Sequence, residues 1–185
     1  FNVDQDKISI NGASNSGVFY GVQLLRKVSF QNNNQLKYPA VKLFDYPRFP
    51  YRGMMLDVAR HFSSVEFVKK FIDLLALHNI NTFHWHLTDD QGWRIEIKKY
   101  PKLTQIGSQR DATVIGKSKT EFDQTPYGGY YTQDQIKEIV AYASQRYITV
   151  IPEIDLPGHM VAALALYPEY VCFCKHSKFP QSWGV

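Results

Sequence analysis

Hydrophobic and polar residues recur along this chain with two different periods, and the two periods alternate. Runs that are apolar or alternate residue by residue predict strands at 52–58, 80–87 and 148–155. Apolar residues at helical spacing predict helices at 64–78, 132–146 and 158–167. Strand followed by helix, three times over, predicts parallel strands joined by right-handed crossovers.

Two of these helices have clear start signals. Ser63-Ser64-Val65-Glu66 and Thr132-Gln133-Asp134-Gln135 each place a hydroxyl three residues before an acid or amide, which is the capping-box pattern. Both segments are therefore predicted to begin helices.

The first part of the chain follows a different pattern. Residues 1–12 alternate enough to predict a strand, and residues 17–30 carry apolar side chains near helical spacing. The Gln- and Asn-rich stretch 31–35 and the Pro-containing run 39–50 are expected to be loop and linker. We therefore place a domain boundary near residue 47, with 1–46 as the end of a small α+β domain and 47–185 as the start of a barrel.

Three strand-helix units are too few to close an eight-stranded (β/α)8 barrel, which needs about 250 residues. The fold class expected is α/β, a partial TIM barrel of about three units, and the chain is expected to be a fragment. Its open parallel sheet would leave an edge exposed, so self-association is also expected. A compact three-stranded α/β sandwich is the alternative fold.

A long stretch separates the strand that ends at 87 from the helix that begins at 132. Long connections of this kind are usually functional or disordered. In a β/α barrel such an elaboration lies on the catalytic face, where the loops that follow the strands build the site.

Composition narrows the function classes. With 44% hydrophobic and 21% charged residues and no long apolar run, the sequence predicts a soluble globular protein without a membrane span. The net charge of +4 is spread along the chain, so nucleic-acid binding is not expected. Because Phe1 opens directly into strand-like sequence, no signal peptide is expected. Cys172 and Cys174 are too few for a disulfide framework or a zinc site.

Polar side chains gather where the predicted strands end. His84 and His86 share one face of their strand, which leads into Asp89 and Asp90. Glycoside hydrolysis employs paired carboxylates, and the residues alone favour Glu153 or Asp155 as the proton donor.

Arg60 follows the first strand of the predicted barrel. Its planar fork can hold two neighbouring sugar hydroxyl groups, and a surface salt bridge is the competing interpretation.

Four motifs carry a resemblance to a known family. They are YRGMMLDVARHF (51–62), HWHLTDDQGWR (84–94), VIPEIDLPGH (150–159) and the earlier GVFYGVQLLRKV (17–28). The first three, in this order, resemble the β-N-acetylhexosaminidases of glycoside hydrolase family 20. The fourth is similar to the end of the small domain that precedes the family's barrel.

The resemblance implies removal of terminal, non-reducing N-acetyl-β-D-hexosamine by retaining, substrate-assisted hydrolysis. In that scheme a glutamate protonates the departing oxygen, and a neighbouring aspartate orients the substrate's 2-acetamido group for attack on the anomeric carbon. The family's adjacent Asp-Glu pair does not occur in this sequence, so the chain alone is expected to be inactive. Glycans containing N-acetylglucosamine or N-acetylgalactosamine are the implied partners, no cofactor is implied, and export from the cytoplasm would suit the family.

The resemblance also assigns roles to individual residues. Asp89 and His159 match the polar relay that supports the catalytic glutamate, and Asp155 matches an acid beside it. Arg60 matches the arginine that grips the sugar hydroxyl groups. Further substrate-binding candidates are His86, Trp93 and Glu153, with packing as the alternative role for His86 and Trp93.

Two other functions remain open from the sequence. His84-x-His86 also resembles the metal pair of amidohydrolases, and His159 with Asp155 could complete a shell of ligands. The Asp-Asp-Gln-Gly-Trp continuation (89–93) belongs to the hexosaminidase pattern and argues against that interpretation, and no metal is expected. Alternatively, Arg60 and the aromatic residues could bind carbohydrate without catalysis.

Overall fold

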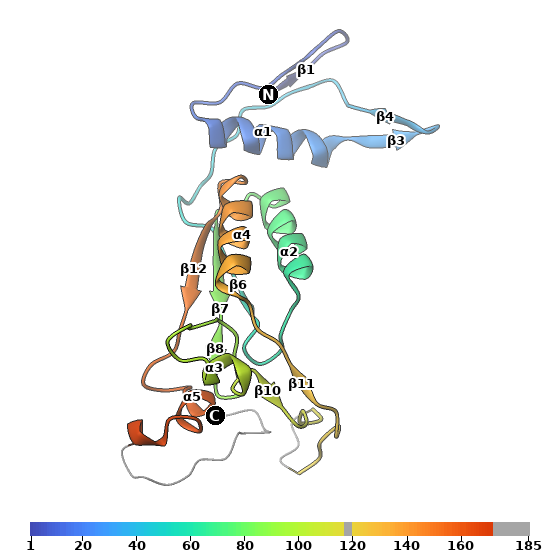
Figure 1. Ribbon diagram of the computed structural model, residues 1–185. Coiled ribbons are helices and arrows are strands. Elements are labelled where there is room, and N and C mark those ends of the chain that lie inside the picture. Colours follow the sequence, from blue (N-terminus) through green and yellow to red (C-terminus); the bar gives the residue numbers. More distant parts are fainter. Residues whose placement is uncertain (117–119, 172–185) are drawn as a thin grey trace.

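The computed structural model describes residues 1–116 and 120–171, and its centre is a parallel sheet (Figure 1). The sheet consists of β6 (Gly53–Asp57), β7 (Thr82–His86) and β12 (Thr149–Glu153), in the order β12-β7-β6. All three strands run in the same direction, and Asp57, His86 and Glu153 share one level at their carboxyl ends. The predicted parallel strands are therefore confirmed.

Two helices cover one face of this sheet. α2 (Val65–Leu77) and α4 (Gln133–Ser144) lie side by side in Figure 1. The alternation of β7 turns Phe83 and Trp85 toward them, and both side chains are fully buried. Because the helices are on the same side of consecutive parallel strands, the crossovers have the arrangement of a β/α barrel.

The opposite face of the sheet is largely uncovered. Met55, His84 and Ile151 form one row across the three strands, and Met55 and Ile151 are exposed. In a complete barrel this face lines the interior. The arrangement fits three consecutive units of a TIM barrel, as the sequence predicts.

The start of α4 follows the sequence prediction and the start of α2 differs from it. Thr132 caps α4, and the reciprocal bonds with Gln135 complete a capping box. The N-cap of α2 is Ser64, whose Oγ accepts a hydrogen bond from the backbone N–H of Phe67. The predicted box from Ser63 is therefore wrong, because the helix begins one residue later and Phe67 occupies the third helical position.

The first part of the chain forms a small sheet beside a helix. Its strands β1 (Asn2–Val3), β2 (Ile8–Ser9) and β5 (Val41–Lys42) are antiparallel, in the order β2-β1-β5. The helix α1 (Asn15–Val28) is capped by Ser14 and starts slightly before the predicted segment.

The prediction of a loop at 31–35 is wrong. β3 (Phe30–Asn32) and β4 (Gln35–Lys37) form a hairpin there. Asn33 and Asn34 both adopt positive φ, 47° and 59°. Asparagine tolerates this conformation, which the tightest two-residue hairpin turns require.

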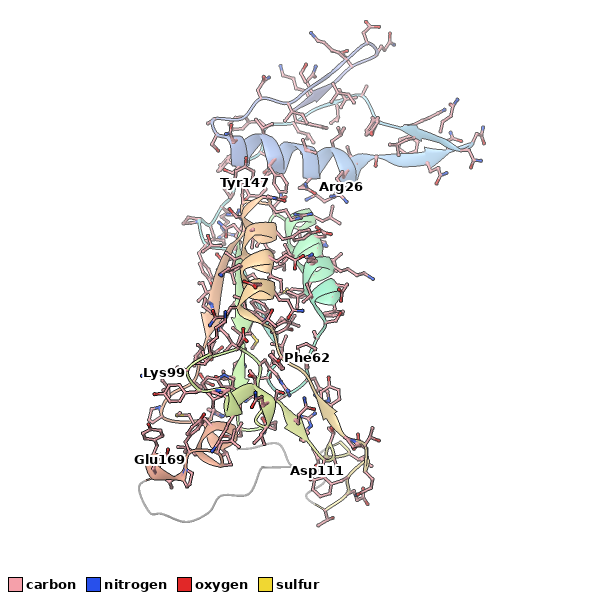
Figure 2. The ribbon with its side chains drawn as sticks, viewed as in Figure 1. Arg26, Phe62, Lys99, Asp111, Tyr147 and Glu169 are labelled. Atoms are coloured by element: carbon pink, nitrogen blue, oxygen red, sulfur yellow. The ribbon has the colours of Figure 1, made fainter. Side chains whose placement is uncertain are left out.

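α1 crosses the end of the barrel part where the strands begin (Figure 1). Phe19 contacts Tyr147 with ring centroids 5.4 Å apart, and Figure 2 shows Tyr147 close to α1. Arg52 lies over the ring of Tyr20 and donates from Nε to the carbonyl of Asn79 at 2.6 Å. The loops that follow the strands lie at the opposite end of the sheet.

The stretch between β7 and α4, which we call the insert, lies at that opposite end. Its elements are short and joined by turns. They are β8 (Thr88–Asp89), β9 (Gly92–Trp93), α3 (Lys102–Gln105), β10 (Gln109–Arg110) and β11 (Tyr127–Gly128).

The last predicted helix is shorter than expected. α5 covers only Val161–Leu164, and a 3-10 turn, η1, follows at Pro168–Tyr170. His159 has a φ of 55°, which a right-handed helix cannot contain, so the helix starts after it. Within the described ranges, no helix has the length and apolarity to cross a membrane. Cys172 and Cys174 lie outside the described residues.

Candidate active site

Charged residues from three loops meet at the carboxyl ends of the strands. Arg60 follows β6, Asp89 follows β7, and His159 follows β12. Nη2 of Arg60 lies 2.7 Å from Oδ2 of Asp89, and Nδ1 of His159 lies 3.2 Å from Oδ1 of Asp89. The structure thus brings two predicted site residues, Arg60 and His159, to the carboxylate of a third, Asp89.

A local turn sets the position of Arg60. Oδ1 of Asp57 accepts hydrogen bonds from the backbone N–H groups of Ala59, at 3.0 Å, and Arg60, at 3.1 Å. Oδ2 of Asp57 accepts one from Nη1 of Arg60 at 2.8 Å. Burial lowers the pKa of Arg60, but the hydrogen bond with Asp57 and the charge of Asp89 outweigh it and the pKa rises. The guanidinium therefore bridges two carboxylates in its charged form.

Asp89 is the centre of the cluster, with 1% of its surface exposed. Its Oδ1 accepts a hydrogen bond from the backbone N–H of Asp90 at 2.7 Å, in addition to the contact with His159. Burial raises the pKa of Asp89, but bonding to His86 and Asp90 and the charge of Arg60 outweigh it and hold the pKa below its usual range. Asp89 is therefore an ionised anchor.

His86 lies behind Asp89 and is 4% exposed. Its Nε2 is 2.9 Å from the carbonyl oxygen of Thr88 and 3.3 Å from one oxygen each of Asp89 and Asp155. Hydrogen bonding to Asp89 outweighs burial and raises the pKa of His86 to about 9. The buried imidazolium links the carboxylates. This burial disfavours the predicted direct contact between His86 and a substrate.

His84 belongs to a separate pair. Its Nε2 lies 2.5 Å from Oε2 of Glu153, and both side chains are partly exposed on the open face of the sheet. Glu153 therefore faces the barrel interior, where a substrate could reach it. His84 and His86 project from the same face, as predicted, but they have different partners.

Trp93 lies outside the polar cluster. Its ring packs with Leu103 and Ala163, and Nε1 donates to the carbonyl of Ile95 at 2.7 Å. It lines an apolar cavity of about 350 Å³ together with Tyr100 and Met160. This position supports packing, the alternative interpretation of Trp93, over direct sugar contact.

Two polar residues in this region, Asp57 and Thr88, were not predicted from the sequence, and Asp90 was named there without a role. Asp57 anchors Arg60, Thr88 Oγ1 accepts a hydrogen bond from the N–H of Asp155 at 3.0 Å, and Asp90 Oδ1 accepts one from the N–H of Val161 at 3.0 Å. These contacts hold the loop after β12 against the loop after β7. Asp57 could have been found, because it lies at the end of the predicted strand 52–58, where a β/α barrel places site residues.

Among the described residues, two groups of side chains place atoms that could bind a metal ion within 4.8 Å of one another. One is His86, Glu153 and Asp155, and the other is Asp89, Asp155 and His159. His84 belongs to neither, so the alternative interpretation, a metal pair of His84 and His86, is not brought together. Nε2 of His86 lies 2.9 Å from the carbonyl oxygen of Thr88, which can only accept a hydrogen bond, so this nitrogen carries a hydrogen and is not free to bind a metal, and Arg60 already pairs with Asp89. The geometry favours a proton network.

Comparison with known proteins agrees with this arrangement. The catalytic domain of glycosyl hydrolase family 20 matches residues 49–184. The chain is 51% identical to a beta-hexosaminidase of Porphyromonas gingivalis over 98% of this chain and 23% of that protein. It is 46% identical to a beta-hexosaminidase of Vibrio furnissii over 91% of this chain and 28% of that protein. It therefore spans about a quarter of the length of these relatives.

A solved structure shares the fold. The crystal structure of an exo-β-N-acetylglucosaminidase of Vibrio harveyi in complex with N-acetylglucosamine superposes with a TM-score of 0.82 at 45% identity. The match covers 91% of this chain and 27% of that one, which confirms the partial TIM barrel. The chain belongs to glycosyl hydrolase family 20.

Proposed function

We propose that the protein carrying this chain is an exo-acting β-N-acetylhexosaminidase. It removes terminal, non-reducing N-acetyl-β-D-hexosamine from glycans with retention of configuration. The observation that carries the proposal is the convergence of Arg60, Asp89 and His159 at one end of the parallel sheet. The names of the relatives, beta-hexosaminidase and exo-β-N-acetylglucosaminidase, support the same reaction.

The contacts of each residue suggest its role. The exposed part of Arg60 binds sugar hydroxyl groups while Asp57 and Asp89 fix its orientation. His159 points Nδ1 at Asp89, which leaves Nε2 available to the carboxyl group that donates the proton. Asp89 thereby orients the imidazole of His159. The charges of His86 and Asp155, whose side chains lie 3.3 Å apart, balance the charges around Asp89.

The acid itself is expected outside these residues. The 185 residues contain no adjacent Asp-Glu pair, which the substrate-assisted route requires. Glu153 lies on the open face of the sheet beside His84, and we assign it to substrate binding.

A chromogenic N-acetyl-β-D-glucosaminide tests the proposal on the complete protein that carries this chain. Turnover is expected, and the matched β-D-glucoside, which lacks the 2-acetamido group, should react far more slowly because the attacking carbonyl is missing. Equal rates on the two substrates, or no turnover of the first, would overturn the proposal.

The isolated chain of 185 residues is expected to be inactive and to bind N-acetylglucosamine weakly at most. A titration followed by tryptophan fluorescence measures that binding. Turnover by the pure chain would refute the assignment of catalysis to an Asp-Glu pair elsewhere.

We also propose that the isolated chain associates with itself. The exposed Met54 and Met55 of β6 and the exposed Ile151 of β12 leave apolar surface on the two outer strands of the described sheet. Sedimentation velocity over a range of concentrations tests this, and a monomer throughout would contradict it.

The division at residue 47 is a further proposal. Val41 and Lys42 pair with β1, whereas Arg52 binds the carbonyl of Asn79 in the barrel part. Limited proteolysis should cut first between residues 43 and 50, which are largely exposed.

A further inference from the structure

The loop between β6 and α2 carries Arg60, and arginines of the insert bind its backbone. Arg94 donates from Nε to the carbonyl of Val58 at 3.2 Å and from Nη2 to the carbonyl of Ala59 at 2.8 Å. Arg110 donates from Nη1 to the carbonyl of Arg60 at 2.7 Å. Three consecutive carbonyl groups are therefore held by side chains that belong to neither β6 nor α2.

Two tyrosines continue this row of contacts. The hydroxyl of Tyr127 donates to the carbonyl of Phe62 at 2.8 Å, and the hydroxyl of Tyr131 donates to the carbonyl of Ser63 at 2.5 Å. Figure 2 shows Phe62 at the level where the strands give way to the insert. We call Arg94, Arg110, Tyr127 and Tyr131 the clamp residues.

The burial of Arg94 indicates that its position is specific. Its side chain is 0% exposed, and Nη1 donates to the carbonyls of Ser108, at 2.5 Å, and Gly129, at 3.1 Å. Its hydrogen-bond acceptors are all backbone carbonyls. Burial lowers the pKa of Arg94 to about 10, so the guanidinium stays charged at neutral pH. Burying such a charge costs free energy. The planar guanidinium of Arg94 bonds the carbonyls of Ser108 and Gly129 in the insert and the carbonyls of the loop at the same time.

Arg110 completes the connection to the site. It is 7% exposed, stacks over the ring of Tyr127 at 4.8 Å, and fixes the backbone of the residue whose guanidinium reaches Asp89. A displacement of this backbone would move the guanidinium of Arg60 relative to Asp57 and Asp89. The position of Arg60 therefore depends on residues that lie beyond β7 in the sequence.

We propose that the insert acts as a positioning device for Arg60, with Arg94 and Arg110 as its principal positioning residues. The inference rests on the proposed function, because the contact of Arg60 with sugar belongs to it. The clamp residues touch the loop and not the substrate. They affect affinity for the terminal sugar through Arg60 alone.

Arg110→Met in the complete enzyme is the first test, because full burial of Arg94 makes its variants prone to unfolding. Loss of one charge-assisted hydrogen bond to the loop should raise KM by about fivefold and change kcat less than about twofold, the pattern of lost uniform binding. Arg110→Lys keeps one donor and should recover part of the affinity. The matched control is Arg146→Met, since Arg146, which follows α4, pairs with Asp73 of α2 at 2.6 Å and should leave KM unchanged.

A double-mutant cycle separates positioning from general destabilisation. In an Arg60→Ala background, Arg110→Met should have no further effect on the affinity for N-acetylglucosamine, measured by titration. An equal loss of affinity with and without Arg60 would overturn the inference, because Arg110 would then act by another route.

A second readout needs no activity. Amide hydrogen exchange in the peptide covering residues 57–63 should become faster in Arg110→Met and stay unchanged in Arg146→Met. Unchanged exchange in Arg110→Met overturns the inference. If the wild-type enzyme turned over no N-acetylhexosaminide, the proposed function would fail, and the exchange rates would still decide whether the insert holds the loop.

Discussion

His159 contacts Asp89 across 70 positions of the sequence, with Nδ1 of the imidazole 3.2 Å from Oδ1 of the carboxylate. Asp89 is 1% exposed, whereas the side chain of His159 is 45% exposed. One partner of the pair is thus part of the packed structure and the other reaches the open site. Because of this difference in burial, substitutions of Asp89 and His159 should have different effects on stability.

His159→Ala should reduce turnover without unfolding the protein. The imidazole is nearly half exposed, so its loss removes little packing, but a proton donor that it holds would lose its orientation. We expect kcat of the complete enzyme to fall by at least about tenfold, a part of the ~10²–10⁴ that proton transfer supplies. Thermal unfolding should stay within a few degrees of wild type. Wild-type turnover would remove His159 from the relay.

Asp89→Asn should reduce both turnover and stability. The amide cannot balance the charges of Arg60 and His86, which remain beside it. We expect a loss of about 1–3 kcal/mol in the free energy of unfolding, measured in urea. Asp134→Asn is the matched control, because that carboxylate is exposed on α4 and should change stability by less than about 0.5 kcal/mol. Equal stabilities of the two variants would contradict the central role of Asp89.

Much of the barrel part could be predicted from sequence because its signals are local. The alternation of β7 and the helical period of α2 each lie in one continuous segment. The insert could not be predicted, because its strands have two residues each and long-range contacts of Arg94 with Ala59 and Gly129 determine its course. The hydrophobic periodicity of a sequence does not indicate such long-range contacts.

The site divides in the same way. Arg60, Asp89 and His159 stand at strand ends, which barrel topology brings together. The separation of His84 from His86 could not be foreseen, since it depends on which carboxylate of β12 or its loop lies opposite each ring.

The stability of the protein should fall between pH 7 and pH 9.5 because of His86. Its pKa of about 9 in the folded protein exceeds the value of about 6.5 expected when unfolded. The stabilisation is therefore fully present below about pH 6.5 and is lost as the pH rises through about 9. The loss should be on the order of 2–3 kcal/mol, measured by urea unfolding at several pH values.

His86→Gln provides the control for this pH dependence. Glutamine keeps a donor for the carbonyl of Thr88 but has no titrating group, so the slope between pH 7 and pH 9.5 should flatten. An unchanged slope in this variant would assign the effect to another group.

The capping box of α4 should contribute measurably to folding. Thr132→Ala removes the acceptor for the N–H of Gln135 and should lower the free energy of unfolding by about 1 kcal/mol. Thr132→Ser keeps the hydroxyl and should stay close to wild type. A similar loss in both variants would point to the methyl group of Thr132 instead of the cap.

Gly92 should be intolerant of even a methyl group because of Arg94. A Cβ at Gly92 would lie 2.3 Å from Nη2 and 2.4 Å from Cζ of the guanidinium. The end of an arginine side chain can usually move aside, but this one is fully buried and bonded to four carbonyl groups. Gly92→Ala should therefore destabilise the protein by about 1–3 kcal/mol, the usual cost of overpacking.

Gly158→Ala is the matched control, since a Cβ there has no atom within 4 Å. Alanine at such a position reduces the entropy of the unfolded chain and should leave stability unchanged or raise it by about 0.4–1 kcal/mol. Urea unfolding of both variants at pH 7 measures the difference. If Gly92→Ala were as stable as Gly158→Ala, the guanidinium of Arg94 would have to move without cost, and its bonds to the β6–α2 loop could not be holding that loop in place.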